Sequence, residues 1–338
     1  MVADQDIPEQ AIQDETVAAE DPADRKRYLT AFVATALILV LVLVSLPPAF
    51  ASMYQELQEQ QAEHSYDLFT GEEMAHDTPI SPDATFVNIL VTSIDEATGV
   101  ASLTMSGHRV CGAICPALKG TLYSLGNDSA RRRGLPPSAT MEVPAESGSY
   151  TMTVELPVRG TPLNYPFDRY TLELGLILEA TFANGLTQMV TSRDVVREQA
   201  VMTIEDRVAR LNMSPPQSID PATARAPSDP FTFLIVDRLQ WERPLYLRIL
   251  AVLLVVLISI SGIYALGLRT LHELVLGIGG IILGIWGIRS IVVQSQLPDV
   301  TLIDIVLGFV ILLLLVGVSL RAAYYFYRRS GGFRPREP

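Results

Sequence analysis

The chain has 338 residues, of which 49% are hydrophobic and 18% are charged, and its formal net charge is -12. This composition is too apolar for a soluble domain of the same length and predicts a membrane protein. The acidic balance lacks the basic character of a nucleic-acid-binding protein, so we expect no nucleic-acid partner.

The N-terminal part is predicted to be a tail followed by a membrane span. Residues 1–27 are acidic and contain no aromatic side chain, which indicates a disordered cytoplasmic tail. The apolar run 28–50 exceeds the roughly 20 residues that cross a bilayer. Its end, Ala49-Phe50-Ala51, also resembles a signal-peptidase site, so cleavage at Ala51 stays open. The length of the apolar run favours retention of the span.

Residues 51–83 are predicted to form a stalk and linker. The stretch from Tyr54 to His64 is polar and rich in helix formers, so the first helix is expected to continue into it. A looser segment follows up to residue 83.

An antiparallel β-sandwich outside the membrane is predicted over 84–246. Apolar and polar residues alternate over Phe86–Ile94 and Val100–Met105, and the turn Asp95–Gly99 between them predicts a hairpin. No helix of crossover length follows, which argues against a parallel α/β sheet. Residues 214–230 are rich in proline and are expected to form an exposed loop. Further strands are expected at 120–125, 149–156, 170–178, 186–191, 199–205 and 231–239.

Cys111 and Cys115 are the only cysteines, and an external location favours a disulfide between them. Free thiols and a metal site are the alternatives. His108 would supply only a third ligand, whereas zinc needs four ligands or three and a water, so we expect no metal.

Three further apolar runs, 247–267, 273–293 and 302–322, are predicted to be transmembrane helices, followed by a basic tail over 323–338. Basic residues before the first span, after the second and after the fourth all fall on one side if both termini are cytoplasmic. The sequence therefore predicts a multi-pass protein of the plasma (inner) membrane, with residues 51–246 outside and with membrane lipid as a partner.

Glycines recur at helical spacing in the third span and share one face. Small residues in this pattern let helices approach closely, so the face is predicted to pack against a helix of this chain or of another protein. A face that lines a pore or cavity is the alternative. The glycines are Gly277, Gly280, Gly284 and Gly287.

Arg289 near the outer end of the third span and Asp304 at the start of the fourth are predicted to form an ion pair within the membrane, because the chain reverses direction between them. Pairing lowers the cost of each buried charge. The sequence contains no nucleophile elbow, phosphate loop or dinucleotide fingerprint, so we expect neither an enzyme nor a cofactor.

Three short motifs occur in order along the chain: Tyr165-Pro166-Phe167-Asp168, Arg243-Pro244-Leu245-Tyr246 and the stretch from Leu297-Pro298 to Asp304-Ile305. Together they resemble motifs of the Cys-loop, or pentameric ligand-gated, ion-channel superfamily. The first resembles the core of its signature loop, the second its entry into the first pore-domain helix, and the third its turn between the second and third pore-domain helices. The string over 165–170 is also similar to that of an uncharacterised group of four-span bacterial and fungal membrane proteins.

The resemblance implies that 273–293 lines a pore, with Glu273 at a cation-favouring charge ring and Leu283 at a hydrophobic gate. It also implies that the sandwich is coupled to the helices at the membrane face, where Asp168 pairs with Arg243 or, alternatively, Arg169 pairs with Glu242. The N-terminal span would take the place of the family's last helix. The implied lining residues are Glu273, Leu276, Gly280, Leu283, Gly287 and Ser290. The implied coupling residues are Tyr165, Pro166, Phe167, Asp168, Arg169, Glu242, Arg243 and Pro298.

Two functions remain open. In the favoured interpretation the protein is a non-enzymatic, membrane-anchored sensor or scaffold that uses a partner membrane helix. In the alternative it is a channel-like receptor that assembles as a homo-oligomer, pentameric as the resemblance implies, and is cation-selective if it conducts. The lining stripe has almost no hydroxyl groups to replace the hydration of an ion.

Overall fold

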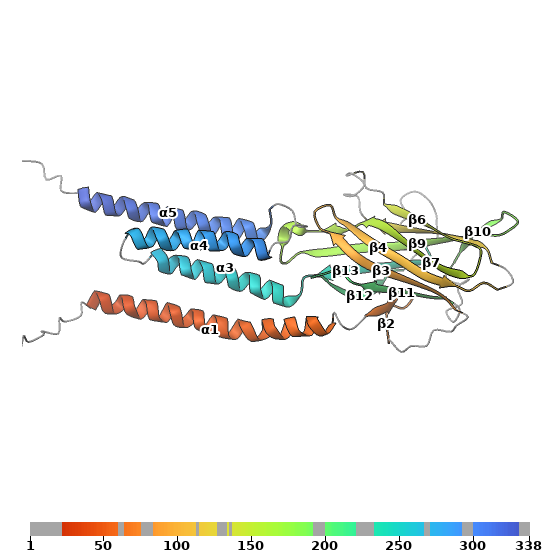
Figure 1. The fold of residues 1–338 in the computed structure, drawn as a ribbon, viewed down its shortest axis with the longest axis horizontal. Helices are drawn as coiled ribbons and strands as arrows, with labels where there is room; N and C mark the ends of the chain where they lie inside the picture. Colours follow the sequence, from red (N-terminus) through yellow and green to blue (C-terminus); the bar gives the residue numbers. More distant parts are fainter. Residues whose placement is uncertain are drawn as a thin grey trace, which may run out of the picture.

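The computed structural model describes residues 22–59, 64–75, 84–112, 115–126, 134, 137–191, 200–220, 233–266, 271–292 and 300–330. The molecule is elongated, with a β-rich domain at one end and helices that run side by side at the other (Figure 1). Most of the predicted acidic tail, Pro298, and the second half of the predicted loop lie outside the described residues.

Two sheets form the β-rich domain. The six-stranded sheet has the order β2-β1-β11-β3-β4-β7, and the other sheet has the order β12-β13-β9-β5-β6, with β8 and β10 also paired to β9. The strands of the first sheet are β1 (Ser65–Asp67), β2 (Glu73–Met74), β3 (Thr85–Asp95), β4 (Val100–Arg109), β7 (Gly148–Pro157) and β11 (Ala200–Asp206). Those of the second are β5 (Ala117–Leu125), β6 (Ser138–Val143), β8 (Arg159–Gly160), β9 (Arg169–Thr181), β10 (Thr187–Val190), β12 (Asn212–Ser218) and β13 (Ile235–Glu242).

The core lies between the sheets and follows from the alternation in the sequence. Alternate residues of each strand point to the same face, so the apolar positions of β3, β4, β9 and β13 meet in one cluster. Its largest fully buried side chains include Trp241 and Tyr170. The predicted sandwich and its first hairpin are therefore present.

The strand predictions differ from the structure in several respects, and β6 and β8 were not predicted at all. The linker over 51–83 contains β1 and β2, which extend the first sheet. The sandwich is also not wholly antiparallel, because β3 and β11 pair in parallel, from Thr85 opposite Ala200 to Val91 opposite Asp206. A parallel pair needs a long connection, and here the remaining strands between β3 and β11 supply it.

The proline-rich segment predicted as a loop begins as a strand. β12 contains Pro215 and Pro216, and it pairs with β13 on one side only. Proline lacks a backbone donor, so an edge strand is where it is tolerated, and the pairing is irregular between Ser214 and Gln217.

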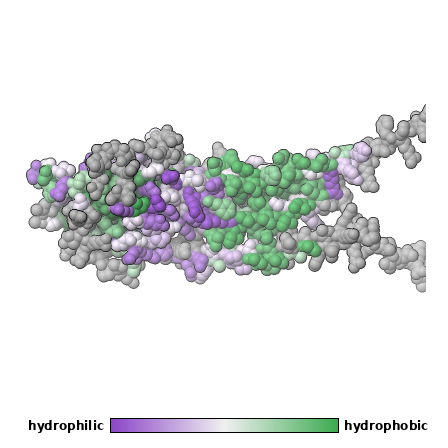
Figure 2. Space-filling view, turned by 180° about the vertical axis from the view of Figure 1, so that it is seen from behind, coloured by the Kyte–Doolittle hydropathy of each residue, from purple (hydrophilic) through white to green (hydrophobic). Residues whose placement is uncertain are grey.

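Helices α1 (Pro22–Glu59), α3 (Leu245–Leu266), α4 (Leu271–Val292) and α5 (Leu302–Ser330) correspond to the four predicted apolar runs. Within the described residues, α3 and the part Leu302–Tyr327 of α5 are long and apolar enough to cross a membrane. Shorter apolar stretches lie at Val40–Gln55 of α1 and His272–Gly287 of α4. Hydrophobic residues form a band around the helices in Figure 2.

The helices α3, α4 and α5 pack against one another, and α1 packs against α3. Two glycines make the closest helix contacts: a Cβ on Gly262 of α3 would lie 2.6 Å from Leu314, and one on Gly317 of α5 would lie 2.7 Å from Leu266. At the sandwich end, the backbone N–H of Tyr246 donates to the Ser52 hydroxyl at 3.2 Å, which ties α1 to the start of α3.

Candidate functional site at the junction of the sandwich and the helices

The predicted signature motif lies on a loop at the base of the sandwich. This loop follows β8, begins with the short 3-10 helix η1 (Pro162–Asn164) and leads through the motif into β9. The Tyr165–Pro166 peptide bond is cis. Tyr165, Pro166 and Asp168 are buried, whereas Phe167 is exposed.

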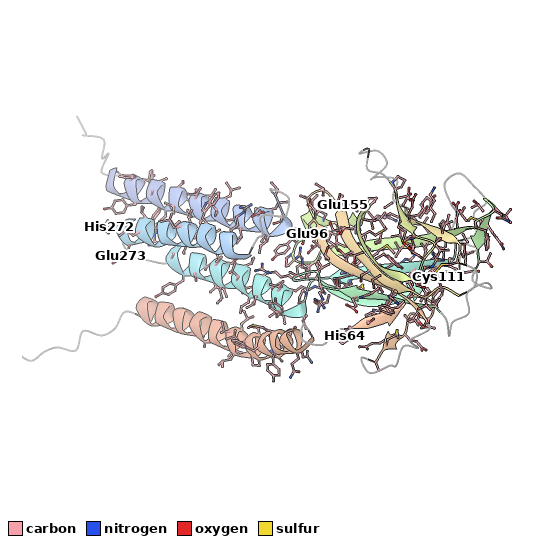
Figure 3. The ribbon with its side chains drawn as sticks, turned by 45° about the vertical axis from the view of Figure 1, so that its right-hand side comes forward. His64, Glu96, Cys111, Glu155, His272 and Glu273 are labelled. Atoms are coloured by element: carbon pink, nitrogen blue, oxygen red, sulfur yellow. A yellow bond between two sulfur atoms is a disulfide. The ribbon has the colours of Figure 1, made fainter. Side chains whose placement is uncertain are left out.

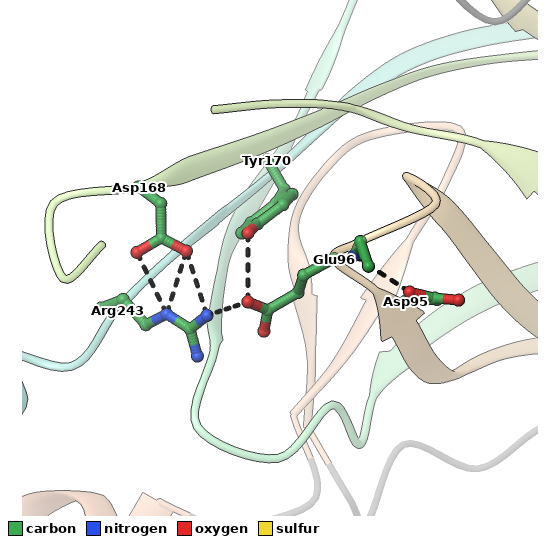
Figure 4. Close-up of polar contacts among 6 residues, drawn as sticks. Asp95, Glu96, Asp168, Tyr170 and Arg243 are labelled. Carbon is green, nitrogen blue, oxygen red and sulfur yellow. Dashed lines mark hydrogen bonds and ion pairs between the residues drawn. The ribbon is translucent and has the colours of Figure 1, made fainter. Parts of the chain in front are cut away.

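Arg243 lies between the end of β13 and the start of α3, and it binds two carboxylates at once. Its Nε donates to Asp168 Oδ1 at 3.2 Å and to Oδ2 at 3.1 Å, and its Nη2 donates to Oδ2 at 3.0 Å. The same Nη2 donates to Glu96 Oε2, which also accepts from the Tyr170 hydroxyl at 3.1 Å (Figure 4). We call Arg243, Asp168, Glu96 and Tyr170 the junction cluster.

The junction cluster is buried, and it contains two carboxylates but only one arginine. Arg243 is 3% exposed, Glu96 is 3% exposed and Asp168 is fully buried. Burial raises the pKa of Glu96, and the attraction of Arg243 only partly offsets this shift. Burial opposes the charged form of Arg243, but the hydrogen bonds to Asp168 and the charge of Glu96 leave the pKa of Arg243 above its usual value.

Tyr165 joins this loop to the helices. Its ring is 2% exposed and belongs to one apolar cluster with Ala251 of α3 and with Ile303 and Leu307 of α5. On its other side the Arg243 guanidinium lies 5.0 Å from the ring centroid. Tyr165 therefore connects the charged cluster above with the apolar packing below.

Both alternative pairings implied by the resemblance occur. Besides the buried pair of Arg243 and Asp168, Arg169 Nε lies 2.8 Å from Glu242 Oε1. Glu242 also binds Arg248 of α3, whose Nη2 lies 2.9 Å from Glu242 Oε2. The surface pair thus extends from β9 through β13 to the first turns of α3.

Arg289 and Asp304 form the expected ion pair, with Arg289 Nη2 3.3 Å from Asp304 Oδ2. Asp304 also accepts from the backbone N–H of Thr301 at 2.9 Å and from its hydroxyl at 2.8 Å. It therefore caps the N-terminus of α5 as well as binding α4, and the Thr301-x-x-Asp304 spacing is a capping-box signal that the sequence interpretation missed.

The residues implied to line a pore lie on α4 and face away from its neighbours. Leu276 is 63% exposed and Leu283 is 74% exposed, and Gly280 is also exposed. The opposite face packs inward through Leu274, Ile278 and Ile285. Figure 3 shows Glu273 at the end of α4 far from the sandwich. The side chain of Ser290 lies outside the described residues.

The glycine face was predicted to pack against a helix of this chain or of another protein, and among the described residues no helix of this chain packs against it. A Cβ built on Gly280, Gly284 or Gly287 would meet no described atom within 4 Å. The physical reason is that α4 uses its large apolar side chains, on the other face, to contact α3 and α5. Gly277 is half-buried.

Cys111 and Cys115 form a disulfide with their Cα atoms 5.4 Å apart. It closes the loop between β4 and β5, at the part of the sandwich far from the helices (Figure 3). Among the described residues, no group of three or more His, Cys, Asp or Glu side chains could hold a metal ion together.

Two buried acids were missed by the sequence interpretation. Glu96 lies in the predicted β3–β4 turn, and nothing local indicates that this turn faces the loop before β9. Asp237 in β13 is different, because it alternates in phase with Leu239 and Trp241, which are apolar and buried. Period-two alternation would have placed Asp237 in the core.

The comparisons with known proteins concern the sandwich. No curated protein matches the chain. A family model described as a domain of unknown function (DUF4436) matches residues 76–229, from just before β3 to just after β12. The matched region includes Asp168 and Glu96 but ends before Arg243 and before α3, so the junction cluster is only partly within the region that is similar to this domain.

Proposed function

We propose that the protein is a non-enzymatic, membrane-anchored sensor whose external β-sandwich and membrane helices move as one coupled unit. The observation that carries the proposal is the junction cluster. Arg243, its buried cation, lies at the start of the segment that leads into α3, and the carboxylates of Asp168 and Glu96 come from turns of the sandwich. Tyr165 extends the contact into the packing of the helices. A simple tether would need no such buried contact.

The proposal places all four helices across the membrane, with both termini in the cytoplasm. Two helices satisfy the length and apolarity of a span by themselves. The start of α1 and the end of α5 lie at the same end of the molecule, far from the sandwich (Figure 1). The basic residues Arg25, Lys26 and Arg27 precede the apolar part of α1, as expected for a cytoplasmic flank.

Removal of the Tyr165 ring tests the coupling. We expect Tyr165→Ala to speed amide hydrogen exchange both in the first turn of α5 and in the β3–β4 turn, on the order of tenfold to hundredfold, because the buried ring packs against α5 and against Arg243, which in turn binds Glu96 of the β3–β4 turn. The measurement is hydrogen–deuterium exchange by mass spectrometry on the full chain in lipid nanodiscs.

Leu186→Ala is the matched control, because it removes an exposed apolar side chain from the β9–β10 hairpin. It should leave exchange at both regions unchanged. Faster exchange in the Tyr165→Ala protein that is confined to the loop itself would mean that the sandwich and the helices are independent, and the sensor proposal would be wrong.

A channel-like receptor is the second candidate, and the exposed face of α4 favours it. Leu276, Gly280 and Leu283 point away from α3 and α5, so a ring of copies would place this face at its axis. A ring of five in native mass measurements of the nanodisc-embedded protein would support this arrangement, whereas a monomer or dimer would exclude it.

The charge of Glu273 then predicts ion selectivity. In a conducting ring we expect Glu273→Lys to shift the reversal potential away from cation selectivity, because fixed charges at a pore mouth select the ions that enter. Glu155→Lys on β7 of the sandwich is the control and should leave the potential unchanged. Unaltered selectivity in a conducting Glu273→Lys protein would refute the pore assignment of α4.

A further inference from the structure

Two apolar side chains at the base of the sandwich point away from its core. Leu163 is 60% exposed and Phe167 is 48% exposed, and both lie on the loop that carries Tyr165. In the described part of the sandwich from Thr85 to Glu242, the one other large apolar side chain with such exposure is Leu186, on the β9–β10 hairpin. Isolated exposed apolar residues are ordinary, but two on one short loop indicate a contact surface.

The loop holds both side chains in place through its own hydrogen bonds. The Asn164 N–H donates to the Thr161 carbonyl at 2.9 Å, and the Phe167 N–H donates to the Asn164 carbonyl at 2.7 Å. The buried ring of Tyr165 fixes the middle of the loop. The loop therefore presents Leu163 and Phe167 on its outer side, while Tyr165 between them points into the packing.

Contacts with the helices fix the position of the loop relative to the helix ends. Tyr165 packs with residues of the first turns of α5, so the loop lies against the helix ends and not above them. The same end of α5 exposes Val300 and Ile305. The loop with Leu163 and Phe167 therefore lies at the sandwich end of the helices, where the apolar band in Figure 2 gives way to hydrophilic residues.

The charge next to the loop fits a lipid headgroup. The Arg169 side chain follows Phe167 by two residues and is 70% exposed, although its Nε is paired with Glu242. An apolar side chain beside an exposed cation is the combination that suits the boundary between acyl chains and phosphates.

We propose that Leu163 and Phe167 insert into the outer-leaflet interface and contact phospholipid acyl chains, so that the coupling loop itself touches the bilayer. The inference rests on the proposed function in one respect, namely that the helices cross a membrane. Lipid composition would then act directly on the loop that carries Tyr165 and Asp168.

The test uses tryptophan fluorescence in vesicles of phosphatidylcholine whose acyl chains are brominated near the glycerol. The chain has two tryptophans, and Trp286→Phe leaves only Trp241, which is buried in the sandwich core. Four tryptophans are then added singly to this background: Leu163→Trp and Phe167→Trp on the loop, Leu186→Trp as the control in water, and Phe309→Trp on α5 as the control in the bilayer.

We expect the two loop tryptophans to lose most of the emission that they add, as Phe309→Trp does, while Leu186→Trp keeps its emission. Loop tryptophans that behave like Leu186→Trp would overturn the proposal, as would loop tryptophans that resist both the brominated lipid and an aqueous quencher, because another copy would then cover them. If Phe309→Trp also keeps its emission, the membrane-spanning arrangement fails, which separates the two failures.

Discussion

Arg243→Met is expected to destabilise the protein by about 3–5 kcal/mol at neutral pH, because removal of the one cation leaves two buried carboxylates without a counter-charge. Asp168 accepts three of the hydrogen bonds that the guanidinium donates, and Glu96 accepts another. The measurement is urea unfolding of the full chain in nanodiscs, followed by the emission of Trp241 in the Trp286→Phe background, since Trp241 is fully buried next to the junction.

The loss should shrink on acidification. Burial raises the pKa of Glu96, and without Arg243 the attraction that partly offsets this shift is lost, so the folded-state pKa of Glu96 would rise further above that of the unfolded chain. Such a group favours the folded state below its unfolded pKa of roughly 4, and this contribution is lost as the pH rises through its folded pKa. The difference between Arg243→Met and the parent should therefore be smaller at pH 5 than at pH 8.

Arg169→Gln is the matched control, because it removes an arginine from an ion pair at the same junction in a solvent-exposed position. Its cost should be about 1 kcal/mol or less, and salt should reduce it. If Arg243→Met and Arg169→Gln cost the same, or if the cost of Arg243→Met does not depend on pH, the junction cluster would not be the buried ionic contact described above.

The helices and the first hairpin could be predicted from the sequence because their signals are local. The apolar runs predict the positions of α1, α3, α4 and α5, and the alternation around the Asp95–Gly99 turn predicts the positions of β3 and β4. The short strands β1 and β2 could not be predicted in this way. They have three and two residues, and they exist because β11 offers β1 a sheet edge and β1 in turn pairs with β2.

For the same reason, only part of the candidate site could be predicted from the sequence. Asp168 and Arg243 were found through the resemblance, and the sequence left open which arginine pairs with which acid. The structure contains both pairs, because β9 and β13 are neighbours and place Arg169 opposite Glu242 while the adjacent residues point inward. Glu96 joins from a turn far away in the chain, and such a contact depends on the packing of whole sheets.

The two glycine patterns show why composition alone misleads about helix packing. The third apolar run carries the conspicuous glycines, yet the close contacts use Gly262 and Gly317, which have no such repeat around them. A small residue permits a close approach but does not attract another helix. The large side chains Leu274, Ile278 and Ile285 decide which face of α4 turns inward.

Asp237→Asn is expected to stabilise the sandwich at pH 8, and this effect should shrink as the pH falls and vanish near pH 4. Asp237 is fully buried, and among the described residues neither of its carboxylate oxygens has a hydrogen-bond partner. Burial raises the pKa of Asp237 to about 7, and the negative charge of Asp67 adds to the shift. The Ser218 hydroxyl lies near enough to oppose the shift slightly but does not reach hydrogen-bond geometry.

The sign follows from the proton balance. Between pH 4 and pH 7 the folded chain holds a proton on Asp237 that the unfolded chain has lost, so the free energy of unfolding falls as the pH rises across this window. The shift from 3.8 to about 7 is roughly three pKa units, which corresponds to an upper figure of about 4 kcal/mol at pH 8. Asparagine resembles the protonated acid in shape and cannot ionise, so the variant escapes this loss.

The measurement is the free energy of unfolding of parent and variant between pH 4 and pH 8, again through Trp241. The two curves should meet near pH 4 and separate as the pH rises towards 7, because only the parent carries a carboxyl that is ionised in the unfolded chain and protonated in the core. Glu155→Gln, which removes an exposed carboxylate from β7 of the same domain (Figure 3), should shift the curve by no more than about 0.5 kcal/mol at any pH. Parallel curves for Asp237→Asn and the parent would show that Asp237 ionises in the folded protein as readily as in the unfolded chain, and the prediction of a buried, protonated acid would be wrong.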